Sequence, residues 1–315
     1  MPAAALALCL YAVPLPLFVE GPGPARDVLP LIDIDGTPTY QPEGRLLFTT
    51  VNVGRVNVYD AVAAAFDEEY HVVPEDLVIP EGLTDEEYDR ISLSQMGASK
   101  IAAVSSALTR LTDYPREHGP GALVYATSPG SPAAGRLFPG ELITAVDGEP
   151  VGDVNELGAL IEDAGAGATL AVTVEAMEGS GDPRTVELRT IRHRDGRPII
   201  GIVPVANFPF DVSIQSGRVG GPSAGLMWSI GVTDLLTPGD LAGGRTLAGT
   251  GGIDLRGRVR PIGGVGLKVL AAERAGADVF LLPRSNLQEA RELAEDIEVV
   301  AIASLDQALE YLESG

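Results

Sequence analysis

The sequence predicts an α+β protein of several domains that follows an apolar N-terminal segment. The chain has 315 residues, whereas one domain usually has about 100–200. Its pattern changes along its length, from mixed helix and strand signals, through short strands between Gly-rich turns, to alternating strands and helices. Hydrophobic residues make up 45% of the chain and charged residues 21%, which is typical of a globular protein. We therefore expect four segments: 1–24, 25–114, 115–195 and 196–315.

Residues 1–24 predict a membrane anchor followed by a linker. No charged residue occurs from Ala3 to Val19, and Glu20 and the run Gly21-Pro22-Gly23-Pro24 then end the apolar stretch. This length is near the lower limit of ~17 residues for a membrane-spanning helix. A signal peptide is the alternative, but no basic residues precede the stretch and no clear cleavage site follows it. We expect a single-pass protein of the cell membrane, with its C-terminal domains outside the cytoplasm.

The charge and the scarcity of certain residues exclude several functions. The net charge of −22 disfavours nucleic-acid binding, which depends on Lys and Arg contacts to phosphates. Lysine occurs only at Lys100 and Lys268, and histidine only at His71, His118 and His193. Zinc sites need clustered His and Cys ligands, and most catalytic triads need a well-placed His. We therefore expect no metal and no cofactor.

Residues 25–114 predict a mixed α/β region. Residues 31–34 and 46–53 are typical of two paired strands, with a turn at Asp35-Gly36. Asn57 is expected to cap a helix, and the capping box Thr84-x-x-Glu87 to open a long helix that is broken or kinked at Gly97. No catalytic constellation occurs here, so we interpret this region as a structural or docking segment.

Residues 115–195 contain short strands separated by Gly, Pro and Asp turns, which from the residues alone predict only a small β-rich module. The strands and turns fall at 121–125, 128–134, 139–143 and 146–151, before a helix over 155–164 and an alternating strand over 169–175. This order resembles a bacterial PDZ domain. The resemblance implies that the loop 119–122 and the strand after it accept an extended peptide as an added strand.

Residues 196–315 alternate strands and helices, which predicts an α/β or α+β layer fold. Here Gly221-Pro222-Ser223-Ala224-Gly225 matches the G-x-S-x-G pattern of α/β-hydrolases. Those enzymes need a His after the Ser, and none follows Ser223. A chymotrypsin-like order could use His71 or His118, but neither occurs in a recognisable setting. Ser223 therefore needs another base.

Lys268 fits that requirement. It lies at the start of a predicted helix, whose positive end disfavours the ammonium form. Burial would lower the pKa of the amine further. Nearly every other basic residue is Arg, which can serve as a surface cation but cannot act as a neutral base. Ser223 also begins a helix, so the backbone N–H groups beside it could stabilise an oxyanion. We predict a catalytic dyad of Ser223 and Lys268.

Several ordered blocks of this segment resemble the proteolytic domain of the Lon family of Ser-Lys peptidases. The blocks are 220–225, 250–254, 257–259, 261–264, 268–272, 274–276 and 282–283. The resemblance implies a fold like ribosomal protein S5 domain 2, Ser223 as nucleophile, Lys268 as general base and Thr250 as an assisting hydroxyl. It also implies that the protein could form a homo-oligomer, because Lon-like domains commonly form rings. Gly252 and the pair Gly266-Leu267 depart from the usual family residues.

No ATPase module accompanies these blocks. A P-loop needs a Gly-Lys pair, but Lys100 follows Ser99 and Lys268 follows Leu267. The whole arrangement resembles a bacterial family of membrane-anchored PDZ and Lon-like peptidases. We expect an ATP-independent serine endopeptidase that cleaves unstructured segments of protein or peptide substrates, captured by the PDZ-like domain. The alternatives are a non-catalytic membrane-anchored PDZ binding protein and an amidase with the same dyad.

Overall fold

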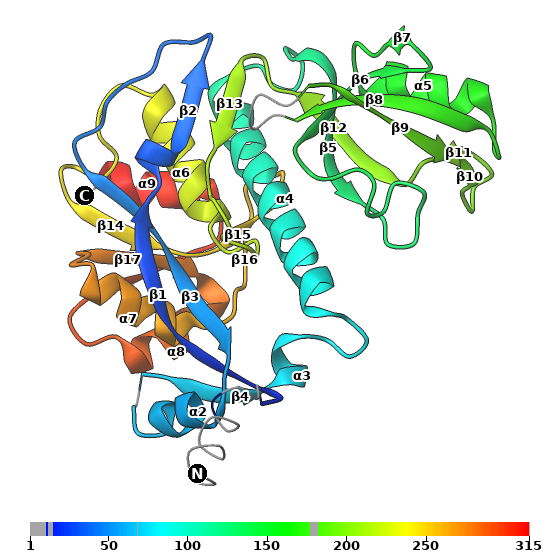
Figure 1. Ribbon diagram of the computed structural model, residues 1–315. Coiled ribbons are helices and arrows are strands. Elements are labelled where there is room, and N and C mark those ends of the chain that lie inside the picture. Colours follow the sequence, from blue (N-terminus) through cyan, green and yellow to red (C-terminus); the bar gives the residue numbers. More distant parts are fainter. Residues whose placement is uncertain (1–10, 12–14, 68, 177–181, 315) are drawn as a thin grey trace, which may run out of the picture.

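The computed structural model describes residue 11 and residues 15–67, 69–176 and 182–314 (Figure 1). The chain forms a larger domain from its N-terminal and C-terminal parts, and a smaller β-rich domain from its middle part. A long helix, α4 (Asp85–Leu111), runs between the two. The catalytic candidates Ser223 and Lys268 both belong to the larger domain.

The larger domain is built on one mixed sheet of six strands, in the order β18-β17-β14-β3-β1-β4. The bounds are β1 Leu17–Asp27, β3 Arg45–Arg55, β4 His71–Pro74, β14 Thr246–Gly249, β17 Val279–Pro283 and β18 Glu298–Ile302. Strands β3, β14, β17 and β18 run parallel, while β1 is antiparallel to β3 and β4. Segments 25–114 and 196–315, which we expected to be separate, therefore share a single sheet.

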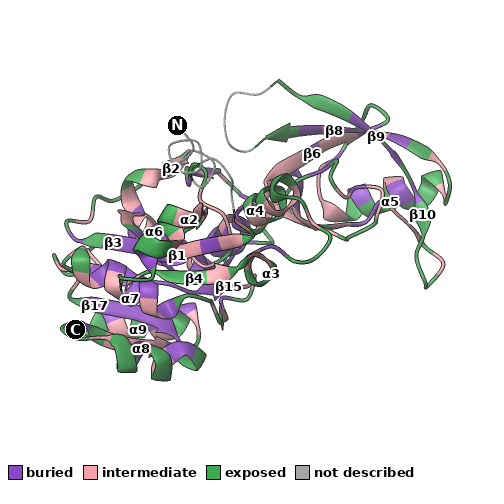
Figure 2. Ribbon diagram, turned by 60° about the horizontal axis from the view of Figure 1, so that its bottom comes forward, coloured by how far each residue is buried: buried purple, intermediate pink, exposed green. Residues whose placement is uncertain are grey.

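Helices cover both faces of this sheet. In β3, Leu46 and Phe48 pack with α6 (Gly225–Leu236), α9 (Leu305–Ser314) and α4, whereas Leu47 packs with α7 (Val265–Arg274) and α8 (Leu287–Leu293). Alternate residues of a strand point to opposite faces, so this apolar run predicts a strand that is covered on both sides. Figure 2 shows the buried residues concentrated in these layers.

The N-terminal strand corrects the expected anchor. In the part of the chain that the structure describes, no helix is both long and apolar enough to span a bilayer. The predicted single-pass localisation at the cell membrane is therefore wrong. Leu17 to Val19 belong instead to β1, where Phe18 is buried between β3 and β4. Residues 3–10 and 12–14 of the expected anchor lie outside the described residues.

The expected Gly-Pro linker lies inside the same strand. A Cβ atom on Gly23 would approach Thr50 Oγ1 to 2.3 Å and the Thr50 carbonyl oxygen to 2.8 Å. The pairing of β1 with β3 shifts register between Pro22 and Ala25. Glycine here permits a close approach of two strands rather than flexibility, which is a recognised use of glycine within a strand.

The smaller domain has its own sheet, in the order β12-β5-β6-β8-β9, and its own hydrophobic core. Its elements are β5 Gly119–Thr127, β6 Glu141–Val146, β7 Glu149–Pro150, α5 Val154–Ala164, β8 Thr169–Ala176, β9 Arg184–Arg189, β10 Ile191–Arg192, β11 Pro198–Ile199 and β12 Ile202–Asn207. The expected boundary at residue 195 falls inside this domain, because β12 completes its sheet. The chain then returns directly to the larger domain.

The remaining short elements connect these parts. They are η1 Leu29–Leu31, β2 Ile32–Asp35, α2 Val58–Ala64, α3 Glu75–Val78, β13 Asp211–Ile214, β15 Gly252–Ile253, β16 Val259–Arg260 and η2 Arg284–Asn286. Strand β2 pairs with β13. From the turn at Asp35-Gly36 we had expected it to pair with β3, so that prediction is wrong. The predicted caps at Asn57 and Thr84 are confirmed.

Helix α4 continues unbroken through Gly97. A Cβ atom there would lie 3.0 Å from the carbonyl oxygen of Pro139 and 3.2 Å from its Cβ atom. Glycine therefore allows the smaller domain to contact the helix, and does not break it.

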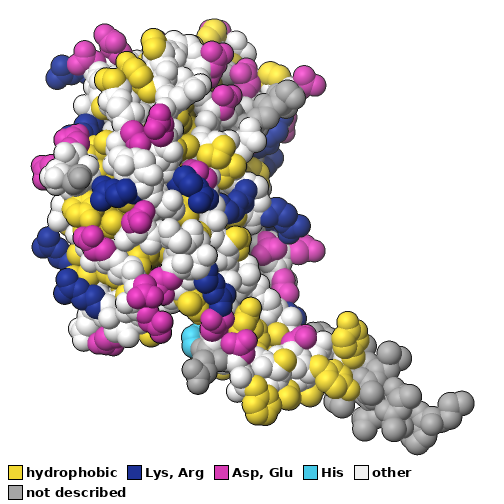
Figure 3. All heavy atoms as spheres, turned by 90° about the vertical axis from the view of Figure 1, so that its left-hand side faces the viewer, with side chains coloured by type: hydrophobic (Ala, Val, Ile, Leu, Met, Phe, Trp, Pro, Cys, Tyr) yellow, Lys and Arg dark blue, Asp and Glu magenta, His cyan; other side chains and the backbone are white. Residues whose placement is uncertain are grey.

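The surface of the larger domain carries acidic and arginine side chains that alternate over the face shown in Figure 3. Several of them form pairs, such as Arg258 with Asp254 and Arg55 with Glu75. Exposed hydrophobic side chains gather near the N-terminal end, on and after α2: Tyr59, Val62, Phe66 and Tyr70.

Candidate active site

Ser223 lies in a tight turn immediately before α6, a helix whose residues 225–234 are all buried. Two contacts from α4 hold this turn. The Gly221 N–H donates to the Ser92 carbonyl oxygen at 2.8 Å, and Ser99 Oγ donates to the Pro222 carbonyl oxygen at 3.0 Å. Gly221 has a φ of 78°, a conformation that favours glycine. The Ser223 side chain remains partly accessible to solvent.

Lys268 lies in the first turn of α7, and only 4% of it is exposed. The helix begins after Gly264, which adopts the left-handed conformation with a φ of 65°. Burial lowers the pKa of Lys268 to about 8, because the charged ammonium loses contact with water. About a tenth of this amine is therefore neutral at pH 7, far more than for an ordinary lysine.

Thr250 connects the two candidates. Its Oγ1 donates to the Ser223 carbonyl oxygen at 3.1 Å, and Lys268 Nζ donates to the same Oγ1 at 3.3 Å. A hydroxyl has one proton to donate and two lone pairs to accept, so both bonds can form together. The Gly251 N–H also donates to the Ser223 carbonyl oxygen, at 2.7 Å. Strand β14, which ends at Gly249, places this fully buried threonine beneath the nucleophile turn.

Ser223 and Lys268 both line a groove of about 940 Å³. Its walls come from β1 and β3, from α4, from residues 218–222 and from residues 261–264. This volume is at the upper end of the range for ligand pockets, about 300–1,000 Å³. An extended peptide segment of several residues would fit.

The backbone at the nucleophile offers two hydrogen-bond donors. Among the described residues, no acceptor contacts the N–H groups of Ser223 and Ala224. Both residues line the groove. Unpaired N–H groups at the start of a helix favour negative charge.

The histidine alternatives do not reach this site. His71 is exposed on β4, and His118 Nδ1 contacts the carbonyl oxygen of Gly119. Neither is among the described residues that line the groove. Within the described residues, no group of three or more His, Cys, Asp or Glu side chains lies where it could hold a metal ion.

Sequence reasoning missed the contribution of α4. Ser92 and Ser99 belong to the segment 25–114, which we interpreted as structural or docking. In the sequence they lie far from the nucleophile turn, since 123 positions separate Ser99 from Pro222. Nothing in the local sequence signals this pairing. The one signal in the sequence is the spacing of seven between Ser92 and Ser99, which places both serines on the same face of a helix.

The smaller domain differs from the expected peptide site. Strand β5, which we expected to accept a peptide, pairs with β12 on one side and with β6 on the other. The prediction that a peptide adds next to residues 119–122 is therefore wrong, because that edge is occupied by β12 of the same chain. The outer strands of this sheet are β12 and β9. Helix α5 lies next to β11 and β12.

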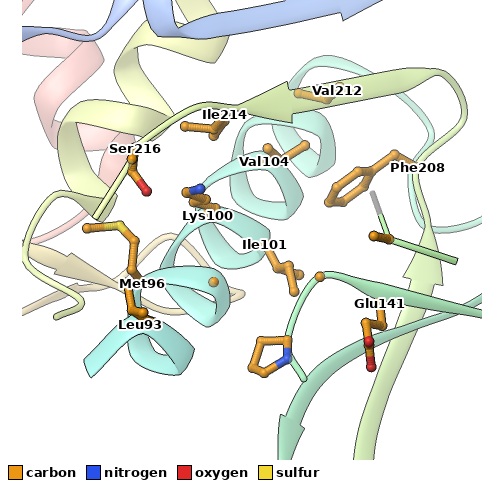
Figure 4. A pocket seen from close by; sticks show the side chains of 15 residues that line it. Leu93, Met96, Lys100, Ile101, Val104, Glu141, Phe208, Val212, Ile214 and Ser216 are labelled. Carbon is orange, nitrogen blue, oxygen red and sulfur yellow. The ribbon is translucent and has the colours of Figure 1, made fainter. Parts of the chain in front are cut away.

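A second pocket, of about 270 Å³, lies between α4 and the smaller domain. Figure 4 shows Leu93, Met96 and Lys100 projecting into it from α4, opposite Phe208 and Glu141. Leu93 and Met96 also line the groove at Ser223. Helix α4 therefore separates the two hollows and contacts both.

Family models match two parts of the chain. The model for the Lon protease (S16) C-terminal proteolytic domain matches residues 211–313, and a PDZ domain model matches residues 123–175. Lon protease of Roseiflexus castenholzii is 44% identical over 104 residues, which is 31% of this chain and 13% of that protein. Lon protease of Clostridioides difficile is 32% identical over 170 residues, which is 47% of this chain and 21% of that protein. The chain thus covers a small share of these relatives.

Solved PDZ domains are also similar to part of the chain. The PDZ domain of the SdrC-like protein from Listeria monocytogenes is 26% identical, covering 27% of this chain and 87% of that one, with a TM-score of 0.25. The corresponding domain from Listeria innocua is also 26% identical and covers 27% of this chain and 92% of that one, with a TM-score of 0.24. The family models confirm both resemblances seen in the sequence. Residues 211–313 thus match a Lon-type (S16) proteolytic domain, and residues 123–175, which precede them, match a PDZ domain.

Proposed function

We propose that the protein is an ATP-independent serine endopeptidase in which Ser223 is the nucleophile and Lys268 the general base. The observation that carries the proposal is the pair of hydrogen bonds that joins Lys268 Nζ, Thr250 Oγ1 and the Ser223 backbone within one groove. A buried amine with a lowered pKa can accept a proton that an ordinary lysine could not. Ser223, Thr250 and Lys268 all lie within residues 211–313, the range that matches the Lon-type proteolytic domain.

The proposed reaction has two steps. Neutral Lys268 removes the Ser223 hydroxyl proton while Oγ attacks a peptide carbonyl, and the Ser223 and Ala224 N–H groups stabilise the oxyanion that forms. The lysine ammonium then protonates the leaving amine, which leaves an acyl-enzyme on Ser223. A water molecule, deprotonated by the same amine, releases the acid and restores the hydroxyl.

The substrates we propose are unstructured protein segments. These 315 residues contain no Gly-Lys pair and hence no P-loop, which supports substrates that need no ATP-driven unfolding. Tails could be captured by the PDZ domain as a strand added to the outer edge of β12, where main-chain groups provide the affinity. We propose the outer edge of β12 in place of the edge of β5, because β12 itself occupies the β5 edge. A shift of the Ile202–Asn207 amide signals when a peptide tail is added, with the β9 signals unmoved, would support it.

The test is cleavage of a permanently unfolded protein, such as a reduced and carboxymethylated one, by the full chain without ATP. Ser223→Ala and Lys268→Met should both abolish cleavage, while Lys100→Met, the same substitution at the other lysine, should not. Equal activity of wild type and Ser223→Ala would refute the dyad. Stimulation by ATP would refute ATP independence.

Two alternatives stay testable in the same assay. A non-catalytic PDZ binding protein would bind tails yet cleave nothing, with Ser223→Ala indistinguishable from wild type in binding and in every activity. An amidase with the same dyad would hydrolyse small amides or esters but not the unfolded protein. The homo-oligomer remains a prediction, and sedimentation of the full chain checks it.

A further inference from the structure

The peptide units on either side of the Ser223 Cα atom are each fixed by hydrogen bonds to their carbonyl oxygens. The Pro222 carbonyl oxygen accepts from Ser99 Oγ at 3.0 Å and from the Gly225 N–H at 3.4 Å. The Ser223 carbonyl oxygen accepts from the Gly251 N–H and from Thr250 Oγ1. Both units are therefore held from the protein interior.

Because a peptide unit is planar, fixing its carbonyl oxygen also fixes the direction of its N–H group. In a trans peptide the C=O and the following N–H point in opposite directions within one plane. The Pro222 carbonyl points toward the buried Ser99, so the Ser223 N–H points away from it. The Ser223 carbonyl points toward Thr250, so the Ala224 N–H points away in turn. Neither of these two N–H groups has an acceptor among the described residues, and both residues line the groove.

We infer that Ser99 is a positioning residue that orients the Ser223 N–H as an oxyanion donor. This inference rests on the proposed function. Ser99 is 3% exposed and lies on α4, outside the matched Lon-type region of residues 211–313. The N-terminal part of the chain thus supplies a component of the site that lies outside the matched region.

Ser99 packs closely against the first turn of α6. A Cβ atom on Gly225 would lie 2.7 Å from Ser99 Oγ. Gly225 thus lets the first turn of α6 approach α4 closely enough for the hydroxyl to reach the Pro222 carbonyl oxygen. The neighbouring face of α4 projects Met96 and Lys100 into the second pocket (Figure 4). Ser99 is therefore held against the nucleophile turn, on a different side of α4 from this pocket.

The experiment compares Ser99→Ala with Ser106→Ala in the full chain. Ser106 is an equally buried serine two turns along α4, and its Oγ donates to the Ala103 carbonyl oxygen. Ser99→Ala should lower kcat about tenfold or more with little change in KM, because its hydrogen bond acts on a donor used in the transition state. Binding of a peptide aldehyde, which forms a tetrahedral adduct with a serine nucleophile, should weaken by a similar factor.

Two further readouts separate positioning from a general loss of structure. The midpoint of the pH–rate profile should be the same in Ser99→Ala as in wild type, because Lys268 is untouched. Ser99→Cys, which keeps a weak donor of similar size, should recover part of kcat. Wild-type kcat and aldehyde affinity in Ser99→Ala would overturn the inference, as would an equal loss in Ser106→Ala. Undiminished cleavage by Ser223→Ala would instead overturn the proposed function itself.

Discussion

Replacing Lys268 by Met should abolish catalysis and at the same time stabilise the fold. The pKa of this amine falls from the 10.5 of an ordinary lysine to about 8 because the side chain is buried. One pKa unit corresponds to about 1.4 kcal/mol, so keeping the charged form buried costs about 3 kcal/mol at pH 7. Methionine has a similar unbranched shape and carries no charge. Loss of the hydrogen bond to Thr250 offsets about 1 kcal/mol, which leaves a gain of about 2 kcal/mol.

The gain should depend on pH in a defined direction. The unfolded chain holds the Lys268 proton more tightly than the folded chain, so the wild-type free energy of unfolding rises with pH between about 8 and 10.5. Lys268→Met lacks this dependence. The difference between the two proteins should therefore be largest below pH 8 and should disappear as the pH approaches 10.5.

Urea unfolding measures this difference directly. The chain has one tryptophan, Trp228, which is fully buried on α6 with its ring centroid 4.9 Å from that of Phe48. Its fluorescence reports on the larger domain. Lys100→Met controls for the substitution. A variant less stable than wild type at pH 7, or an advantage that persists unchanged to pH 10.5, would refute the burial penalty assigned to Lys268.

The remaining predictions address the same site and the strand that supports it. In wild type, kcat/KM should rise with pH and level off above about 8, because only the neutral Lys268 amine can act as base; a flat profile from pH 6 to 9 would contradict this. Thr250→Val should lower kcat by about tenfold or more, since the Lys268 amine loses the hydroxyl that orients it. The control Thr233→Val, at a buried threonine within α6, should leave kcat unchanged. Gly23→Ala should lower the free energy of unfolding by about 1–3 kcal/mol through overpacking against Thr50, while Gly54→Ala, where a Cβ would contact nothing within 4 Å, should leave it nearly unchanged in urea unfolding.

The candidate site was largely predictable because its chemistry depends on scarce residue types. With two lysines and no histidine after Ser223, elimination left Lys268 as the base, and the structure places both residues in one groove. The helices that present them were also predictable, since both follow Gly-rich turns. The proposed roles of Ser223 and Lys268 still await the cleavage assay.

The N-terminal strand could not be predicted by the same means. An apolar run that ends in Gly-Pro-Gly-Pro is typical of an anchor and linker, and no local signal shows that β3 lies beside it. The strand is specified by a partner about 30 residues away, as the pairing of Pro22 with Val51 shows. Tertiary pairing of this kind overrides local propensity. A chain that began at Arg26 would lack most of β1 and is therefore a poor choice for a soluble fragment.

The position of α4 shows that residues 211–313 do not contain every contact that holds this site. Residues 211–313 contain the nucleophile, the base and Thr250, but the peptide unit before Ser223 is held by a helix from the other end of the chain. Between Ser92 and Ser99, on a different face of the same helix, Gly97 contacts Pro139 of the PDZ domain. A change in that contact would act on the helix that positions the nucleophile turn. The two family domains are therefore joined through an element that belongs to neither matched region.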